Sequence, residues 1–278
     1  MRNILIAAAL SFPLAVSIPL TVQADELIVR GDRLFIHAEV NGRKAEALLD
    51  SGAEMTVLDA RFARKAQLAE GEEVTARGTG AGTVKAQIVE GVDLTALGRQ
   101  IVLPAAAVMD LSDIEARVVK APVPVIVGRD LFDAGRLAID IEGRRIEWLS
   151  GDEPMVGVML PLSASHGIET IPVTFGGVAA DADFDLGNGT GLLLSRELAE
   201  RLKLRPVGVE PAGGIGAAAG RTVVYVPELT IAGRIFRNVR AHVADNAQVP
   251  ANVGVGLLRR FRIVTDFRQR AVWLHPIE

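Results

Sequence analysis

The same order of an apolar strand, an acidic residue and a glycine turn occurs twice in this chain. In the first copy an apolar run ends at Asp50, and Gly52 follows two residues later. In the second copy Asp185 and Gly187 have the same spacing after another apolar run. An internal repeat constrains the architecture more strongly than a short motif does. Because there are only two copies, the chain is predicted to be a duplicated domain rather than a solenoid.

The two copies stay in register over a long stretch. Aligning Asp185 with Asp50 also aligns Gly177 with Gly42 without a gap. The further aligned pairs are Ile36 and Ile171, Ala38 and Val173, Val40 and Phe175, Leu94 and Leu229, and Gly98 and Gly233. Alternating apolar positions such as 36–40 are typical of a strand with one buried face.

A second pair of segments closes each copy. The first is Ile126-Val127-Gly128, and its counterpart is Asn252-Val253-Gly254. An acid follows each closing glycine at equal spacing, Asp140 in the first copy and Asp266 in the second, and a tryptophan comes later in each, Trp148 and Trp273. The second copy has nine fewer residues between Gly233 and its closing glycine, so we expect the two copies to differ there in loop length.

The acidic turn alone has two interpretations. Asp, Ser and Gly all favour turns, so residues 50–52 could form only a hairpin tip. A carboxylate between two buried strands is costly, however, unless a neighbouring group needs it. The repetition of the turn favours a functional site.

These segments resemble the retropepsin-like aspartic proteases, in a fused two-lobe form related in plan to pepsin. The resemblance rests on the Asp-Ser-Gly-Ala loop at 50–53, on Ile126–Gly128 before a short helix, and on the repetition of both. It implies an all-β fold of two β-barrel lobes related by a pseudo-twofold axis, with short helices. We expect the lobes at residues 25–150 and 155–278, divided by the turn-rich stretch at 150–154.

The resemblance implies an exported aspartic endopeptidase in which Asp50 and Asp185 are catalytic. Two carboxyl groups that face each other cannot both ionise, so they share one proton and can activate a water molecule. Gly52 and Gly187 would allow the two loops to approach closely. The hydroxyl of Ser51 would bond to the backbone of the opposite loop.

The second loop departs from the family pattern. Leu186 stands where Ser or Thr is expected, and Asn188 replaces the usual small residue. Three interpretations stay open. Asp50 and Asp185 form an asymmetric pair in a monomer; or two chains pair through their Asp50 loops as a homodimer; or the molecule is a peptide-binding module without catalysis.

Two glycine-rich segments are candidate flaps over a substrate. In the first, Gly78, Thr79 and Gly80 are the candidate substrate-binding residues, with a flexible surface turn as the alternative. The second is Gly213–Gly216. Pepsin-like enzymes normally use one flap, so one of the two segments is expected to be a vestige.

Residues 1–24 have the features of a signal peptide. Arg2 precedes an apolar run from Ile4 to Leu20, and small residues at 22–24 offer a cleavage site. We therefore expect an exported protein, periplasmic or secreted, that begins near Asp25 and has no membrane span after cleavage. The chain contains no cysteine, which excludes disulfides and cysteine-linked lipids.

Composition restricts the partners. The formal net charge of −4 argues against nucleic acid, and the four histidines lack metal-ligand spacing. We expect no cofactor and no metal, a protein or peptide substrate, and a monomer, with the homodimer as the alternative.

Other elements are predicted from local pattern. A short helix is expected over Asp59–Leu68, strands over Val84–Val92 and Gln100–Val108, and a second helix with Ser195 as its N-cap. The stretch Asp110–Ala121 has no clear periodicity.

Overall fold

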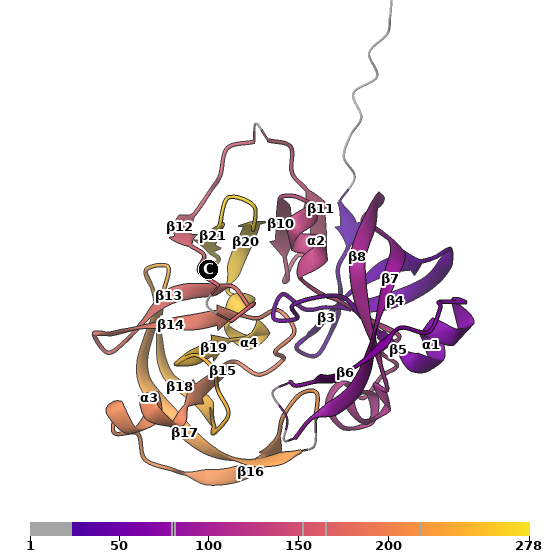
Figure 1. The fold of residues 1–278 in the computed structure, drawn as a ribbon. Coiled ribbons are helices and arrows are strands. Elements are labelled where there is room, and N and C mark those ends of the chain that lie inside the picture. The colour runs from indigo at the N-terminus through magenta and orange to yellow at the C-terminus, as the bar shows by residue number, and fades with distance from the viewer. Residues whose placement is uncertain (1–23, 79, 81, 152, 165, 217) are drawn as a thin grey trace, which may run out of the picture.

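The computed structural model describes residues 24–278 except 79, 81, 152, 165 and 217. The predicted signal peptide therefore lies almost wholly outside the described residues, and its cleavage stays a prediction. The described chain consists mainly of β-strands with a few short helices, so the predicted all-β class is confirmed (Figure 1). None of the helices described is long and apolar enough to cross a membrane.

Within the first half of the chain, residues 25–150, the described residues form eleven strands and three short helical elements. The strands are β1 (Asp25–Glu26), β2 (Ile28–Arg30), β3 (Arg33–Val40), β4 (Arg43–Leu49), β5 (Val57–Asp59), β6 (Glu72–Ala76), β7 (Val84–Ala96), β8 (Arg99–Met109), β9 (Val125–Val127), β10 (Leu137–Asp140) and β11 (Arg145–Trp148). The helical elements are α1 (Ala60–Lys65), the π-helix η1 (Ile114–Val119) and α2 (Arg129–Ala134).

The second half, residues 155–278, repeats most of this order. Its strands are β12 (Val158–Pro161), β13 (Thr170–Phe175), β14 (Val178–Phe184), β15 (Leu192–Ser195), β16 (Gly208–Ala212), β17 (Ala219–Ile231), β18 (Arg234–Ala244), β19 (Ala251–Val253), β20 (Phe261–Asp266) and β21 (Ala271–Pro276). Its helices are α3 (Arg196–Arg201) and α4 (Val255–Leu258).

Each half forms a sheet that closes on itself. In the first half the neighbours run β3-β4-β9-β5-β8-β7, and β7 pairs again with β3. In the second half β13-β14-β19-β15-β18-β17 close through β17 and β13 in the same way. The parallel pairs are also equivalent, because β4 pairs with β9 as β14 pairs with β19. The pairing therefore bears out the duplication that the sequence register predicts.

A third sheet joins the two halves. Its order is β1-β11-β10-β20-β21-β12, so each half contributes three strands. At its centre β10 and β20 are antiparallel, with Ile139 opposite Ile263. This sheet lies above and between the two barrels in Figure 1. The predicted boundary at 150–154 falls in the connection between β11 and β12, and its role as a domain boundary stays a prediction.

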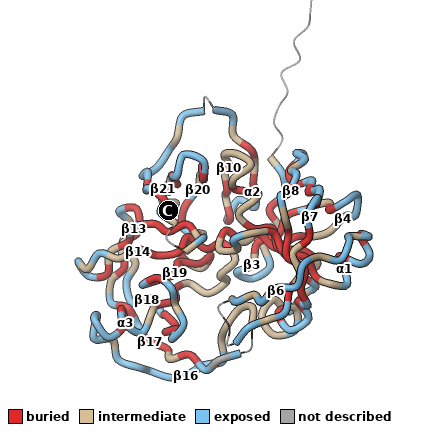
Figure 2. Tube along the Cα trace, viewed as in Figure 1, coloured by how far each residue is buried: buried red, intermediate tan, exposed pale blue. Residues whose placement is uncertain are grey.

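Local sequence explains how the acidic strands begin and end. The turn at Asn41 and Gly42 has φ angles of 47° and 78°, which suit the two-residue hairpin that joins β3 to β4. Strand β4 is exposed at its start and buried at Ala47 to Leu49, so its end enters the core directly before Asp50. Buried residues follow the strands of both barrels and of the joining sheet (Figure 2).

The other local predictions hold with shifted bounds. The helix α1 is shorter than predicted and has Asp59 as its N-cap, and Ser195 caps α3. Strands β7 and β8 extend beyond the predicted ranges. The stretch without periodicity contains η1, whose presence accounts for the extra residues of the first half.

Candidate active site

The first acidic loop follows the buried end of β4. The backbone N–H of Asp50 donates to the carbonyl of Val127 in β9 at 3.0 Å, so the neighbouring strand fixes the loop. The N–H of Gly52 donates to Oδ1 of Asp50 at 2.9 Å and orients the carboxyl group. The closing segment Ile126–Gly128 thus lies beside the loop.

The second acidic loop follows β14 with the same backbone pattern. The N–H of Asp185 donates to the carbonyl of Val253 in β19 at 3.1 Å. The N–H groups of Gly187 and Asn188 both donate to Oδ1 of Asp185 at 2.9 Å. The carboxyl group of Asp185 is buried, with 8% of the residue exposed.

The two loops face each other at contact distance. A Cβ atom added to Gly52 would lie 2.7 Å from Cγ of Asp185, and one added to Gly187 would lie even closer to Cγ of Asp50. Any side chain at either position would therefore collide with the opposite carboxyl group. The carboxyl group of Asp185 lies close enough to that of Asp50 to raise its pKa. The structure thus brings the predicted pair together, and its catalytic role stays a prediction.

Ser51 links the loops on one side only. Its hydroxyl donates to the carbonyl of Phe184 at 2.7 Å and accepts from the N–H of Leu186 at 2.9 Å. Leu186 occupies the equivalent position in the second loop and is fully buried, so it offers no hydroxyl in return. The site is asymmetric, as the sequence predicts.

The surroundings of Asp50 favour the protonated form of its carboxyl group. Burial, together with the neighbouring carboxyl group of Asp185, raises the pKa of Asp50 to about 8. The guanidinium group of Arg33 faces both acids and donates to the carbonyl of Gly187, and its positive charge opposes this rise. An acid with this pKa still carries its proton at neutral pH, so the carboxyl group of Asp50 is protonated there.

Two glycine-rich segments meet across the halves. Gly78 and Gly80 are described, and Thr79 lies outside the described residues. The N–H of Gly80 donates to the carbonyl of Ile215 at 2.9 Å, and Gly78 packs so closely that an added Cβ would lie 2.6 Å from Cβ of Ile215. Ile215 packs on the same apolar cluster as Met55, which closely follows the first acidic loop. The two segments therefore contact each other across the halves, and which of them acts as a flap stays a prediction.

Residues 36–131 match the family model described as aspartyl protease. The matched range includes the Asp50 loop and Gly128 but ends before Asp185. DNA damage-inducible protein 1 of Yarrowia lipolytica (strain CLIB 122 / E 150) is 36% identical over 63 residues, which are 21% of this chain and 16% of that protein. The chain thus spans about a sixth of the length of that relative. The similarity to the family model is confined to the first half of the chain.

Several polar residues beside the second acid were not predicted. They are Arg33, His166, Asp183 and Asn252. For Asp183 and Asn252 the sequence did contain a signal. These two polar residues pair across β14 and β19, whereas the equivalent pair in the first half is apolar, Leu48 and Ile126.

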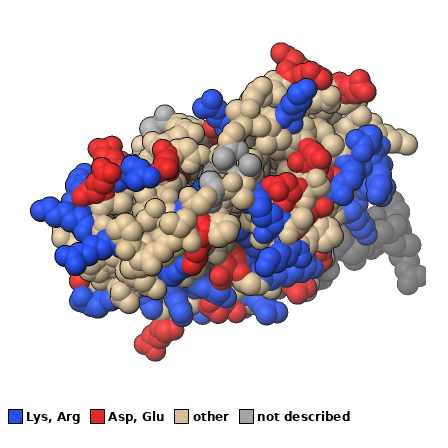
Figure 3. Space-filling model, turned by 90° about the horizontal axis from the view of Figure 1, so that it is seen from below, with Lys and Arg blue, Asp and Glu red and all other residues tan. Residues whose placement is uncertain are grey.

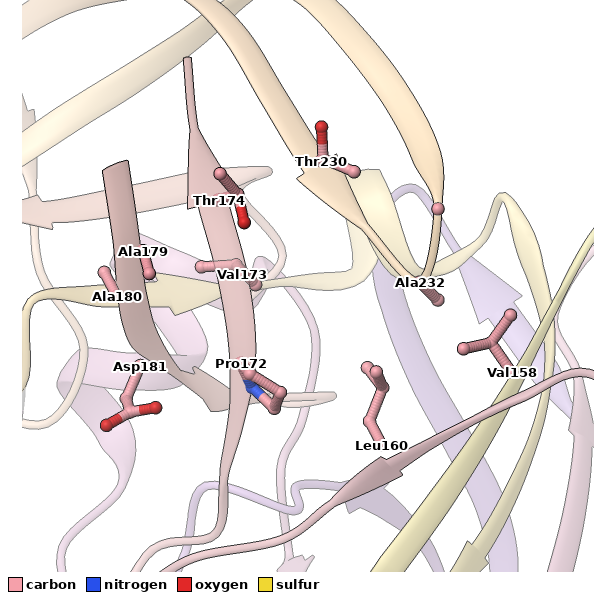
Figure 4. Close-up of a pocket in the computed structure, with 11 residues that line it drawn as sticks. Val158, Leu160, Pro172, Val173, Thr174, Ala179, Ala180, Asp181, Thr230 and Ala232 are labelled. Carbon is pink, nitrogen blue, oxygen red and sulfur yellow. The ribbon is translucent and has the colours of Figure 1, made fainter. Parts of the chain in front are cut away.

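Two surface depressions lie away from the acids. One of about 430 Å³ lies on the outside of the second half, between β12, β13 and the β17–β18 turn. Figure 4 shows its largely apolar walls, to which Leu160, Pro172 and Ala232 contribute. Neither acidic loop lines it, so it carries no part of the proposed chemistry.

Proposed function

We propose that this protein is an aspartic endopeptidase that hydrolyses peptide bonds with a water molecule activated between Asp50 and Asp185. The observation that carries the proposal is the direct apposition of the two carboxyl groups across two glycines that cannot bear side chains. The similarity of residues 36–131 to aspartyl proteases supports it.

The arrangement supplies both functions that hydrolysis needs. The ionised carboxylate takes a proton from water as the water oxygen forms a bond to the carbonyl carbon. The protonated carboxyl group hydrogen-bonds the carbonyl oxygen and stabilises the negative charge that develops there. A proton then passes to the amide nitrogen, the C–N bond breaks, and a free acid and a free amine leave.

A single chain supplies both acids in this proposal. The hydroxyl of Ser51 already bonds to the Phe184 carbonyl of the same chain, and Gly187 already lies against Asp50. A homodimer built on two Asp50 loops would have to separate these contacts first. The monomer with an internal pair is therefore favoured.

We further propose a protein or peptide substrate and an exported location, periplasmic or secreted. The first rests on the proposed reaction, and the second on the leader-like features of residues 1–24. Acidic and basic side chains are interspersed on the face seen in Figure 3, which agrees with a partner other than nucleic acid. Mass spectrometry of exported protein should find an N-terminus near Asp25; an intact precursor in the membrane fraction contradicts the export proposal.

Peptide hydrolysis is tested with a defined peptide mixture and mass spectrometry. Wild-type protein is expected to generate new termini, and hydrolysis in water enriched in ¹⁸O should label the new carboxyl groups with one heavy oxygen. Asp50→Asn is the matched control, because it keeps the shape of the side chain but cannot ionise. New termini of equal abundance in the control, or none with the wild type across the pH range, contradict the proposal.

A further inference from the structure

The two acids receive unequal numbers of hydrogen bonds. Among the residues that the structure describes, the carboxyl group of Asp50 accepts one N–H donor, from Gly52. Asp185 accepts three, because Gly187 and Asn188 donate to Oδ1 and the side-chain amide of Asn252 donates to Oδ2 at 2.7 Å. Hydrogen bonds that donate to a carboxylate stabilise its ionised form. Both oxygens of Asp185 thus act as acceptors, which is the pattern of an ionised group.

The direction of the Asn252 amide is determined by a chain of neighbours. The backbone N–H of Thr190, which can only donate, points at Oδ1 of Asn188 at 2.9 Å. This places Nδ2 of Asn188 toward Oδ1 of Asn252 at 2.6 Å, and in turn Nδ2 of Asn252 toward Asp185. A flipped amide at either position would set two donors or two acceptors against each other. Asn252 is therefore held as a donor.

The hydrogen bond from the Asn252 side chain to the acid has no counterpart in the first half. The position equivalent to Asn252 is Ile126, which pairs with Leu48 as Asn252 pairs with Asp183. Ile126 and Leu48 are buried and carry no hydrogen-bonding group. The first acid consequently has no side-chain donor at this position, so the two halves differ in how their acids are hydrogen-bonded.

The charged groups around Asp185 are compatible with its ionised form. Arg33 faces it from β3 and interacts with it as well as with Asp50 and Asp32. Asp183 lies behind it, and Oδ1 of that residue contacts Nε2 of His166 at 3.0 Å. Burial, with the nearby Asp185, raises the pKa of Asp183 to about 7, which limits the repulsion from a second negative charge.

We propose that Asn252 is a positioning residue that makes Asp185 the ionised base and leaves the shared proton on Asp50. This inference rests on the proposed function. Asp185 then takes the proton from water, and the Asp50 hydroxyl hydrogen-bonds the substrate carbonyl. The pair is thus assigned its two roles by the asymmetry between the halves rather than by the acids themselves.

The protonation states are tested directly by carbon NMR of protein labelled at aspartate Cγ. At about pH 6, the Asp185 carbon is expected at the chemical shift of a carboxylate and the Asp50 carbon at that of a protonated acid. The signals are assigned by their loss in Asp185→Asn and Asp50→Asn. The reverse assignment, or two carboxylates, overturns the proposal.

The role of Asn252 is tested with Asn252→Leu, which keeps the branching of the side chain and removes the donor. The acidic limb of the pH profile of kcat/KM is expected to move to higher pH by about one unit, with little change of KM. Ile126→Leu is the matched control at the equivalent position and should leave the Asp185 signal unchanged. Asn188→Ala, which frees the Asn252 amide, should move the limb in the same direction even if Asn252→Leu does not fold. An unmoved limb in both variants contradicts the role of Asn252.

Failure of this inference differs from failure of the proposed function. A protein that cleaves no peptide can still show Asp185 ionised and Asp50 protonated, which leaves the proton assignment intact and removes the hydrolysis. A protein that cleaves peptides but shows the reverse assignment keeps the hydrolysis and loses the assignment.

Discussion

The hydroxyl of Ser51 is the only side-chain group from the first loop that bonds across to the backbone of the second loop, among the residues that the structure describes. It holds the Phe184 carbonyl and the Leu186 N–H, both in a buried position. Leu186 cannot repeat these contacts. The relative position of the two acids therefore depends more on Ser51 than a symmetric site would require.

Ser51→Ala tests this dependence. It leaves a buried N–H and a buried carbonyl without a partner, so we expect the free energy of unfolding to fall by about 1–3 kcal/mol. Activity should fall further than stability explains, because the acids lose their alignment. Urea unfolding and peptide cleavage of the same preparations measure the two effects. Ser51→Thr keeps the hydroxyl and is the control; equal loss in both variants would show that packing, not the hydroxyl, matters.

At the scale of elements, η1 in the first half binds the glycine-rich segment Gly213–Gly216 of the second half. Arg117 in η1 donates to the carbonyls of Gly213, Gly214 and Gly216 at 2.9, 3.0 and 2.8 Å. Asp113 fixes the guanidinium group at 2.6 Å. In return, Asn246, which follows β18, donates to the carbonyl of Gly80 at 3.2 Å. Each half thus holds the glycine-rich segment of the other.

Arg117→Ala should weaken this contact. Three carbonyl groups lose their donor, so we expect amide hydrogen exchange of Gly80, whose N–H bonds to Ile215, to become several-fold faster. Mass spectrometry of peptic fragments measures the exchange. Arg117→Lys keeps the charge but offers fewer donors in a planar array, so it should give an intermediate rate. Unchanged exchange in both variants would mean that the contact does not hold the segment.

The sequence register could predict the duplication, the two acids and their glycines, because these features depend on local pattern and on the repeat, and the family resemblance added the barrels. It could also predict the missing hydroxyl at Leu186. The contact of Gly80 with Ile215 could not be predicted, since it depends on how the joining sheet places the two halves. Arg33 was missed for the same reason: it begins β3 in the first half, yet it contacts Gly187 in the second. Asn252 differed visibly from Ile126, but only the fold shows that its amide faces Asp185.

For the whole molecule, the retained protons predict how stability depends on pH. The pKa of Asp50 is raised to about 8 and that of Asp183 to about 7, mainly by burial. The folded protein therefore keeps protons that the unfolded chain releases near pH 4. Stability contributed by these groups is present at low pH and is lost as pH rises toward 8. Burial lowers the pKa of His242, so the stability contributed by this group increases with pH. This increase is confined to pH values below about 6.5.

We accordingly expect the urea midpoint of the wild type to decrease between about pH 6.5 and 8. Asp50→Asn cannot release a proton, so its midpoint should change less over the same window. Intrinsic fluorescence of the two tryptophans follows the unfolding. A wild-type midpoint that rises with pH in this window would contradict the buried protonated state of Asp50.

The proposed hydrolysis depends above all on Asp185 being the partner of Asp50 within one chain. The most direct measurement is the peptide-cleavage rate of Asp185→Asn relative to wild type, at equal concentration and with folding verified by circular dichroism. An internal pair predicts that the rate falls by at least about a hundredfold, and to a similar level in Asp50→Asn, because the two acids act as a unit. A rate equal to that of the wild type would show that Asp50 works without Asp185, and would replace the internal pair with a homodimer.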